Sequence, residues 1–262
     1  MKYLNFLRTY VCLLLGFAAF TACTSEEDDA LIPEGKGYVK LSLNADTGFQ
    51  TKAVNESEYR DVNNYTVQII NNSTNSLVKQ YTGGSLPEDL IELNSGGYTV
   101  KAFYGQDVPA STTSMYVEGS TIFNINSNTV ENVAVTCTPV CARVTIVEDE
   151  TLENYFKNWK ATFKTVALEQ ASYDYDKGDD PVYLKVNNGG EKVTCSYQFT
   201  KNDGTIIELE GNPYSYTLSP NKAMKITLKP LGSANGQLGI TVEIDGTVTE
   251  HVIDITIPSD WV

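Results

Sequence analysis

The stretch Leu93-Asn94-Ser95-Gly96-Gly97-Tyr98-Thr99-Val100-Lys101-Ala102 places two glycines between the end of one apolar segment and the start of an alternating one. Alternation of apolar and polar residues is typical of a β-strand that buries one face, and a Gly-Gly pair is typical of a turn. The stretch therefore predicts a strand, a glycine turn and a return strand, which is the hairpin that a β-sandwich requires.

Segments that alternate between apolar and polar residues recur along the chain. Turn signals such as Asn202-Asp203-Gly204 and Asp245-Gly246 separate them. Short strands with a turn roughly every ten residues indicate a sandwich or barrel. For residues 151–156 we predict either one helical turn or a short strand. The other predicted strands lie at 38–43, 64–70, 77–81, 89–93, 120–125, 130–137, 140–147, 159–166, 182–186, 192–199, 205–209, 223–228, 238–244 and 248–257.

The strands fall into two groups of similar length. A charged stretch, Glu148-Asp149-Glu150, interrupts them near the middle of the chain. We therefore expect an all-β protein of two tandem antiparallel β-sandwich domains, at residues 37–148 and 149–262. The two halves have no residue-level repeat, and the alternative of one large all-β domain has a suitable length as well.

The N-terminus has the pattern of a secretory signal. Lys2 and Arg8 precede an apolar run of ten residues, and Phe20-Thr21-Ala22-Cys23 resembles the lipobox at which a bacterial lipoprotein is cut and acylated. The run is too short to span a bilayer core of roughly 30 Å. We expect residues 1–22 to be a signal peptide and Cys23 to carry the lipid. The alternative is an ordinary signal peptide with a coincidental cysteine, because Leu is commoner than Phe at position 20.

Residues 23–36 are polar, acidic and interrupted by Pro33 and Gly35, which predicts a lipidated tether rather than a packed segment. Removal of the signal takes away two cations and no acid, so the formal net charge changes from −14 to −16. A chain this acidic is a poor partner for nucleic acid or an anionic membrane surface.

Three cysteines remain in the chain after Cys23, so a complete disulfide framework is excluded. A Cys137–Cys141 bridge is conceivable, with Pro139 turning the chain between them. The alternation around each cysteine favours small buried hydrophobic side chains instead. Zinc is improbable, because there is no second cysteine pair.

A catalytic constellation is missing from the sequence. The single histidine, His251, lies in an alternating strand, which favours a structural role. There is no Gly-x-Ser-x-Gly nucleophile elbow and no phosphate-binding glycine loop. We therefore expect a protein that is not an enzyme and needs no cofactor.

The acidic segment at 173–180 is the sharpest local cluster of chemistry. Asp174 and Asp176 occupy the first and third positions of a calcium-type loop, with Asp180 nearby. Gly178 stands at the fifth position and the distal Glu is missing, so a solvated loop is favoured over a metal site.

Tyrosine is abundant, with 16 residues. Their aromatic rings are either platforms for a sugar or, as their period of two favours, partly or fully buried. The tyrosines concerned are Tyr173, Tyr175, Tyr183, Tyr214 and Tyr216.

Several short motifs occur in a fixed order along the first half of the chain. They are Gly37-Tyr38-Val39-Lys40-Leu41-Ser42-Leu43, Thr51-Lys52-Ala53, Asn64-Tyr65-Thr66-Val67, the 93–102 stretch, Tyr116-Val117-Glu118-Gly119-Ser120, Phe123 and Val133-Ala134-Val135-Thr136-Cys137. This order resembles an uncharacterised domain family of Bacteroidetes lipoproteins that is related to the fimbrillins. The resemblance covers most of residues 37–147, and in the second half it is confined to Val182-Tyr183-Leu184. It implies two tandem transthyretin-like, Greek-key β-sandwiches, and assembly by strand addition after a protease removes the first strand.

The resemblance also suggests two processing features. Removal of the first strand follows an arginine in fimbrillins, and the candidate here is Arg60, with Lys52 as the weaker alternative. An acidic run after the lipidated cysteine resembles the signal that exports Bacteroidetes lipoproteins to the cell surface. The residues of this run are Ser25, Glu26, Glu27, Asp28 and Asp29.

Together these observations predict a lipid-anchored protein of the cell outer membrane that faces outward. We expect a fimbrillin-like structural or adhesion component whose partners are the membrane, through Cys23, and other fimbrial subunits or a host ligand. The alternative is a carbohydrate-binding lipoprotein of a glycan-uptake system.

Overall fold

The computed structural model describes residues 35–49, 55–208, 213–231, 237–244, 247–249 and 255–256. Cys23, the acidic run at 25–29, Lys52 and His251 lie outside these residues. The described chain is mostly β-strand, as predicted, with three sheets and one short helix. No helix among the described residues is long and apolar enough to cross a membrane.

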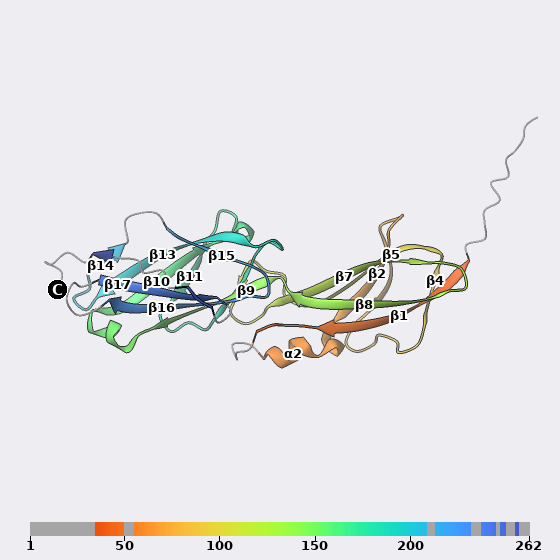
Figure 1. Cartoon of the computed structure of the whole chain (residues 1–262), viewed down its shortest axis with the longest axis horizontal. Coiled ribbons are helices and arrows are strands. Elements are labelled where there is room, and N and C mark those ends of the chain that lie inside the picture. The colour runs from red at the N-terminus through yellow and green to blue at the C-terminus, as the bar shows by residue number, and fades with distance from the viewer. Residues whose placement is uncertain are drawn as a thin grey trace, which may run out of the picture.

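The first sheet, with its core, forms what we call the first body, on the right in Figure 1. Its seven strands run in the order β3-β2-β5-β7-β8-β1-β4. Its elements are β1 (Lys36–Ala45), α2 (Glu56–Arg60), the 3-10 helix η1 (Val62–Asn64), β2 (Thr66–Asn71), β3 (Ser76–Tyr81), β4 (Ile91–Asn94), β5 (Gly96–Gly105), β7 (Tyr116–Ile125) and β8 (Val130–Pro139).

The other two sheets form the second body. One has the order β11-β10-β13-β14, with β15 also paired to β13, and the other has the order β18-β17-β16-β9-β12-β6, with β19 paired to β17. Their elements are β6 (Ala110–Ser111), β9 (Cys141–Glu148), η2 (Glu150–Asn154), β10 (Phe156–Lys164), η3 (Val166–Leu168), β11 (Tyr173–Asp176), β12 (Val182–Lys185), β13 (Glu191–Lys201), β14 (Ile206–Glu208), β15 (Tyr214–Leu218), β16 (Ala223–Leu231), β17 (Gln237–Ile244), β18 (Thr247–Thr249) and β19 (Ile255–Thr256).

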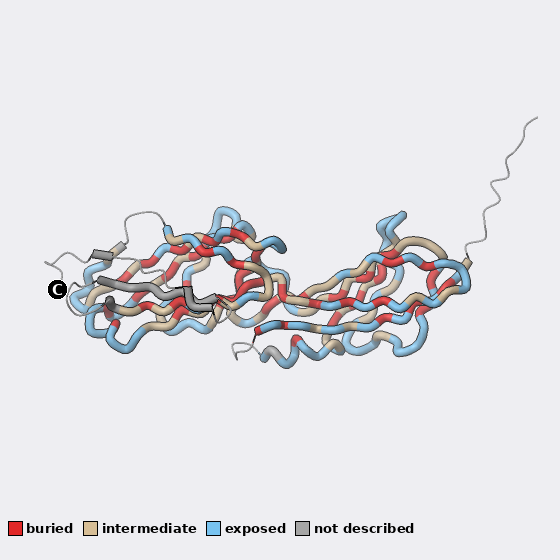
Figure 2. Tube along the Cα trace, in the orientation of Figure 1, coloured by how far each residue is buried: buried red, intermediate tan, exposed pale blue. Residues whose placement is uncertain are grey.

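Each body has its own hydrophobic core, and Figure 2 shows the buried positions alternating along the strands that face it. In the first body, β1, β4 and β8 contribute one side of the core, and β2, β5 and β7 contribute the other. In the second body, the apolar faces of both sheets meet in one cluster that includes Trp159 and Phe163. Alternation in the sequence predicted these faces because each strand has one apolar side.

The chain passes from the first body to the second within three residues. β8 ends at Pro139 and β9 begins at Cys141, and β9 pairs with β12 and β16 of the second body. The sequence placed residues 140–147 in the first half and the boundary after Glu148. The change of core falls at the start of β9, because Cys141 packs into the first cluster and Ala142, Val144 and Ile146 pack into the second.

The glycine turn at Ser95-Gly96-Gly97 joins two layers rather than two paired strands. β4 pairs with β1, whereas β5 pairs with β2 and β7. The prediction of a hairpin here is therefore wrong. Ser95 is held at the corner because its backbone N–H donates to the carbonyl of Gly35 over 2.7 Å, and Gly96 adopts φ +152°.

The sequence also predicts a hairpin of residues 120–125 and 130–137 with a turn at Ser127-Asn128, and this hairpin of β7 and β8 is only partly formed. The turn lies at Ser127-Asn128 as expected, but the strands pair only at their far ends, at Val117–Pro139 and Glu118–Thr138. Near the turn β8 lies beside β1 and β7 beside β5. Both corners connect the layers around the core, and the sequence does not distinguish such corners from hairpin turns.

Two pairs of strands are parallel, which corrects the expectation of purely antiparallel sheets. β1 runs parallel to β8 from Tyr38–Val130 to Ala45–Cys137. β9 runs parallel to β16 from Arg143–Ala223 to Glu148–Leu228. Parallel neighbours cannot be joined by a tight turn, so no local signal announces them.

Candidate functional site at the junction of the two bodies

Two neighbouring strands of the second body are buried on both faces where they meet the first body. Residues 141–144 of β9 and 182–184 of β12 are all buried. One face carries Val144 and Leu184 into the second core. The other face carries Arg143 and Tyr183, which lie directly opposite each other across the β9–β12 pair. The side chains of Arg143 and Tyr183 therefore form a floor toward the first body.

A short segment after β1 rests on this floor. We call Thr47-Gly48-Phe49 the plug, because both side chains are 1% exposed. The Phe49 ring makes an edge contact with Tyr183, with ring centroids 5.7 Å apart, and the guanidinium carbon of Arg143 lies 5.5 Å from the Phe49 centroid. Arg143 is 7% exposed and Tyr183 is 2% exposed. The plug thus connects the N-terminal segment to the second body.

Gly48 lets the plug approach the second body closely. Its φ is +62°, a conformation that L side chains rarely adopt. A Cβ atom at this position would lie 2.4 Å from Oδ1 of Asn221, in the turn before β16. The backbone angle favours glycine, and a Cβ atom here would displace the end of the Asn221 side chain. We call Arg143, Tyr183 and Asn221, the residues of the second body that face Phe49 and Gly48, the socket.

Arg60, the candidate processing residue, lies beside the plug. It is the last residue of α2 and is exposed. Its Nε donates to Oγ1 of Thr47 over 3.2 Å, and its Nη2 donates to the carbonyl of Phe49 over 3.3 Å. The side chain of Arg60 therefore holds the segment that lies between β1 and the second body.

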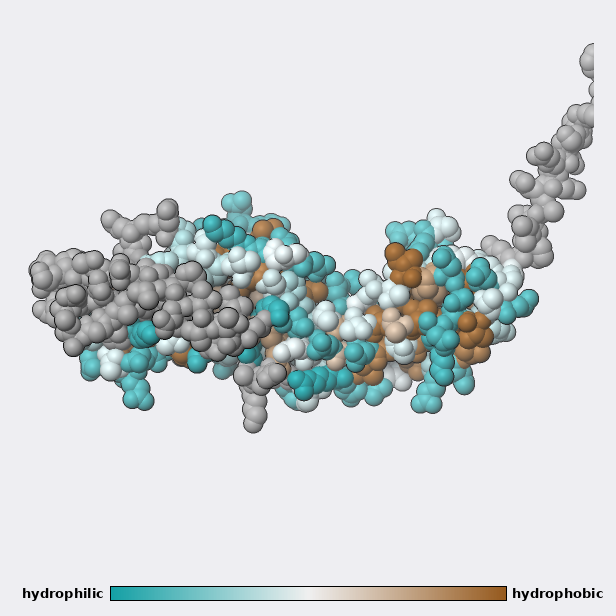
Figure 3. Space-filling model, viewed as in Figure 1, coloured by the Kyte–Doolittle hydropathy of each residue, from teal (hydrophilic) through white to brown (hydrophobic). Residues whose placement is uncertain are grey.

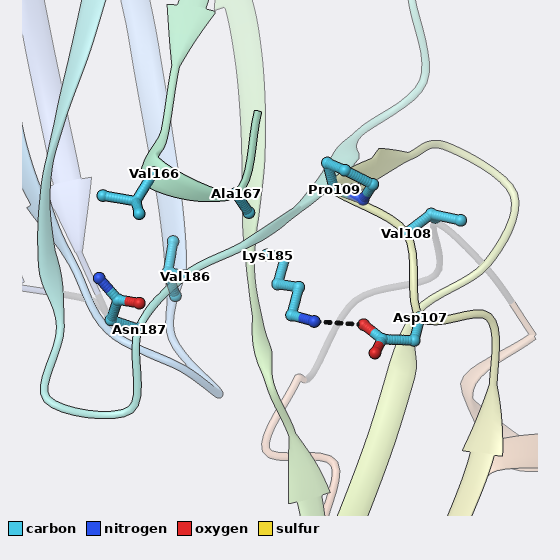
Figure 4. A pocket seen from close by; sticks show the side chains of 8 residues that line it. All are labelled: Asp107, Val108, Pro109, Val166, Ala167, Lys185, Val186 and Asn187. Carbon is cyan, nitrogen blue, oxygen red and sulfur yellow. Dashed lines mark hydrogen bonds and ion pairs between the residues drawn. The ribbon is translucent and has the colours of Figure 1, made fainter. Parts of the chain in front are cut away.

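A second seam joins the bodies at the other edge of β12. The two-residue strand β6, which follows β5 in the chain, pairs with β12 at Ser111–Tyr183 and Ala110–Leu184. Beside it, Nζ of Lys185 lies 2.6 Å from Oδ1 of Asp107, as the dashed line in Figure 4 shows. These two residues and the valines around them line a hollow of about 340 Å³.

A larger and more polar hollow, of about 550 Å³, lies between β5, β7 and β8 and loops of the second body. Its one ion pair joins Lys101 and Glu118, with 3.0 Å between Nζ and Oε2. The two charges neutralise each other, and the remaining polar groups of the lining are hydroxyl and amide groups among apolar residues. The hydroxyl groups belong to Thr99, Ser120, Thr136, Thr138 and Ser219.

Apolar side chains are exposed on the first body. Figure 3 shows apolar residues among hydrophilic ones on its visible face. Ile122 on β7 is 75% exposed, and Leu77 and Val78 on β3 are also exposed. Scattered apolar residues are normal on a protein surface, so we assign them no role.

The three aspartates of the calcium candidate are not brought together. Asp174 and Asp176 lie on strand β11, where the sequence predicted a loop. Asp174 accepts hydrogen bonds from Oγ1 of Thr162 at 2.8 Å and from Nζ of Lys160 at 3.2 Å, which lower its pKa. The described residues contain no group of three His, Cys, Asp or Glu side chains that could hold a metal ion.

The cysteines are buried and free in the described structure, as the alternation favoured. Burial raises the pKa of the Cys137 thiol to about 11 and those of Cys141 and Cys195 to about 12. Thiols with such high pKa values are poor nucleophiles at neutral pH.

The tyrosines singled out by the sequence belong to the cores. Tyr175 stacks on Trp159, and the hydroxyls of Tyr197 and Tyr216 form a buried pair at 3.1 Å. Tyr173 and Tyr214 are partly buried and pack against the second core. The rings of Tyr175, Tyr183 and Tyr216 are therefore no platforms for a sugar.

Sequence reasoning missed Arg143 and Phe49. Arg143 follows Cys141-Ala142, where alternation would place an outward polar residue, and nothing local shows that the outward side is covered. Phe49 comes after the predicted strand at 38–43. The one available signal is an isolated aromatic residue next to a glycine.

The sequence comparison identifies a family. Residues 35–259 match the model of the family described as "Domain of unknown function (DUF4493)". Comparison with curated proteins finds no significant match.

Three solved structures are similar over most of their length, at low identity. A proposed cell adhesion protein from Bacteroides eggerthii is 14% identical, with a TM-score of 0.45 over 85% of this chain and 99% of the other. The fimbrial anchor protein Mfa2 from Porphyromonas gingivalis is 12% identical, with a TM-score of 0.43 over 81% and 99%. Proposed polysaccharide-binding proteins from Bacteroides thetaiotaomicron are 10% identical, with a TM-score of 0.45 over 82% and 98%.

Proposed function

The chain belongs to the DUF4493 family, and we propose that it is a non-enzymatic structural or adhesion component of the bacterial cell surface. In this proposal the lipid on Cys23 holds it in the outer membrane, and the acidic run at 25–29 directs it outward. Its two bodies act as tandem transthyretin-like, Greek-key β-sandwiches, as the sequence resemblance implies.

The observation that carries the proposal is the position of β1. The first strand of the described chain lies inside its sheet, between β4 and β8, instead of at an edge. It pairs with β8 over eight residues and with β4 over four, and it buries Val39 completely. A cut after Arg60 would leave β1 attached to the body by non-covalent contacts alone.

Loss of β1 would open a groove that can bind an extended segment by strand addition. The facing edges of β4 and β8 would present unpaired backbone groups beside an apolar channel, which an extended segment fills by strand addition. A second subunit that supplies this segment would be joined to the first. If no cut occurs, the protein stays a standalone anchored lipoprotein.

The N-terminus of the mature protein on cells tests this function. A start after Lys52 or Arg60, with high-molecular-weight ladders that resist mild heating in detergent, is the expected result for a polymerising subunit. A start at Cys23 without ladders would limit the protein to an anchor or adhesin.

Lipidation and export need separate measurements. Palmitate labelling of the wild type and its loss in Cys23→Ala test the anchor, and equal labelling of both would contradict it. Protease treatment of intact cells tests the orientation. A protein that survives this treatment would be facing inward.

A second candidate function is supported by the polar hollow of about 550 Å³. Its hydroxyl groups and its internally neutralised ion pair suit an uncharged, hydroxyl-rich ligand such as a glycan. We propose a glycan array on the purified protein as the test. A hit that disappears in Lys101→Met and persists in the exposed-lysine control Lys192→Met favours this function.

A further inference from the structure

The plug continues the register that β1 sets on β8. Ala45 lies opposite Cys137, and the N–H of Asp46 donates to the carbonyl of Cys137 over 2.9 Å. Phe49 therefore reaches the socket at a fixed distance from the paired strand. A slip of one residue would move it by about 3.4 Å and turn the β1 side chains to the opposite face.

The second body positions the walls of the socket. Arg143 and Tyr183 stand on two paired strands whose opposite faces are anchored in the second core. Asn221 is held by its N–H, which donates to the carbonyl of Cys141 over 3.0 Å. None of these three residues belongs to the segment that a cut after Arg60 would release.

The chemistry of the socket favours an aromatic ring preceded by glycine. The edge contact with Tyr183 and the cation–π contact with Arg143 need a π face or edge, and each contributes on the order of 1 kcal/mol. An aliphatic side chain of similar volume would fill the space without these contacts. Position 48 favours glycine because its φ is +62°, and a larger residue there would also displace the Asn221 side chain.

We propose that the socket of Arg143, Tyr183 and Asn221 is a recognition site for a Gly-aromatic pair that follows the strand paired with β8. Within the proposed function, on which this inference rests, the occupant that replaces the plug is the extended segment of another subunit. The groove binds the backbone of that segment, and the socket at the far end selects its sequence and sets its register.

Arg60 connects the socket with processing. A protease that cuts after Arg60 must first withdraw its guanidinium from Thr47 and Phe49. After Cys23 the chain contains two arginines, Arg60 and the buried Arg143. Limited digestion of the folded lipid-free chain with an arginine-specific protease is therefore expected to give a single nick after Arg60.

The nicked protein provides the test. Labelled peptides with the sequence of residues 36–49 are added in excess, and displacement of the native segment is followed by fluorescence polarisation and mass spectrometry. We expect the wild-type and Phe49→Tyr peptides to bind alike. We expect Phe49→Ala to bind about tenfold or more weakly, and Gly48→Ala to be similarly impaired. The matched control is Ser42→Ala, an exposed position of β1, which should stay within about twofold.

Two results would overturn the proposal. Equal affinity of the Phe49→Ala and Ser42→Ala peptides would contradict the selectivity of the socket for an aromatic ring. A lack of binding by every peptide would contradict the recognition of a replacing strand. Both results are independent of the proposed function, because the nick is made in vitro. If cells were to keep the N-terminus at Cys23 and form no ladders, the strand exchange in the proposed function would fail and the peptide affinities would stand.

A measurement on the intact chain supports the peptide series. Native-state hydrogen exchange of β12 should be faster in Phe49→Ala than in the wild type, and unchanged in Phe49→Tyr. Unchanged exchange in both variants would show that Phe49 does not stabilise the socket, which contradicts the proposal.

Discussion

β1 and β9 occupy the same place in their two bodies, although they share no sequence pattern. Each runs parallel to a later strand of its body, β8 or β16, and antiparallel to a short strand on its other side, β4 or β12. Figure 1 shows both strands running along the long axis of the molecule. The bodies are thus repeats of topology without being repeats of sequence.

The two strands differ in what covers them. The inward face of β1 is buried and its outward face is exposed, whereas residues 141–144 of β9 are buried on both faces. β9 is also joined to the chain at both ends, through Pro139 and through η2. Two strands in the same sheet position therefore differ in how far their outward face is covered.

The largest effect we expect compares a glycine from each body. Gly105 and Gly178 have almost the same φ, +92° and +89°. A Cβ on Gly105 would lie 1.9 Å from the carbonyl oxygen of Met115, whereas a Cβ on Gly178 would meet nothing within 4 Å. We expect Gly105→Ala to lower the free energy of unfolding by about 4 kcal/mol and Gly178→Ala by about 1 kcal/mol. Denaturant titration measures both, and equal losses would show that the backbone angle alone sets the cost.

A second prediction compares β1 with β9. Val39 of β1 and Val144 of β9 are both fully buried. We expect each valine-to-alanine change to cost about 2 kcal/mol, because each removes two buried methyl groups and leaves a cavity. Hydrogen exchange should accelerate in β4 and β8 for Val39→Ala, and in β12 and β16 for Val144→Ala. Acceleration in both bodies from either change would mean that the bodies unfold as one unit.

Alkaline pH should weaken both bodies. Burial raises the pKa of Cys137 to about 11 and of Cys195 to about 12, above the ordinary thiol value of 9.0. Above pH 9 the unfolded chain therefore loses thiol protons that the folded chain keeps, so the free energy of unfolding falls as pH rises toward these values. Each cysteine-to-alanine variant should lose its thiol's part of this fall in the free energy of unfolding, about 1 kcal/mol per pH unit. The effect of Cys195→Ala should extend to a higher pH than that of Cys137→Ala. Denaturant titrations from pH 8 to pH 12 measure it, and identical slopes in wild type and variants would contradict the prediction.

The smallest effect concerns the ion pair across the junction. Lys185 and Asp107 are both partly exposed, so solvent screens their attraction. A double-mutant cycle with Lys185→Met and Asp107→Asn should give a coupling of about 0.5 kcal/mol that decreases with salt. A coupling several times larger would make this pair, rather than the plug, the main link between the bodies.

Alternation predicted most strand positions because it depends only on which face of a strand is buried. It predicted the burial of Val39, Tyr98 and Val135 for the same reason. Pairing was less predictable. The stretch at 93–102 reads as a hairpin, yet β4 and β5 lie in different layers, because a turn signal reports where the chain bends and not what its arms then pair with.

The candidate site was the least predictable part of the molecule. Arg60 is found from the sequence through its resemblance to a processing site, but its contacts with Thr47 and Phe49 are not. Arg143 reads as an ordinary residue of an alternating strand, and Tyr183 is singled out only as a buried ring or a sugar platform. Their second buried face exists only because the plug and β6 arrive from a distant part of the chain.

The sequence by itself determined the class of the protein, the approximate strands and the faces that form the two cores. These features are local, because each depends on the order of apolar and polar residues within about ten positions. Only the tertiary structure decided that β1 inserts parallel to β8, that β9 belongs to the second body and that Phe49 fills a socket between them. Those features depend on contacts between segments far apart in the chain, and such contacts leave no periodic signal in either segment.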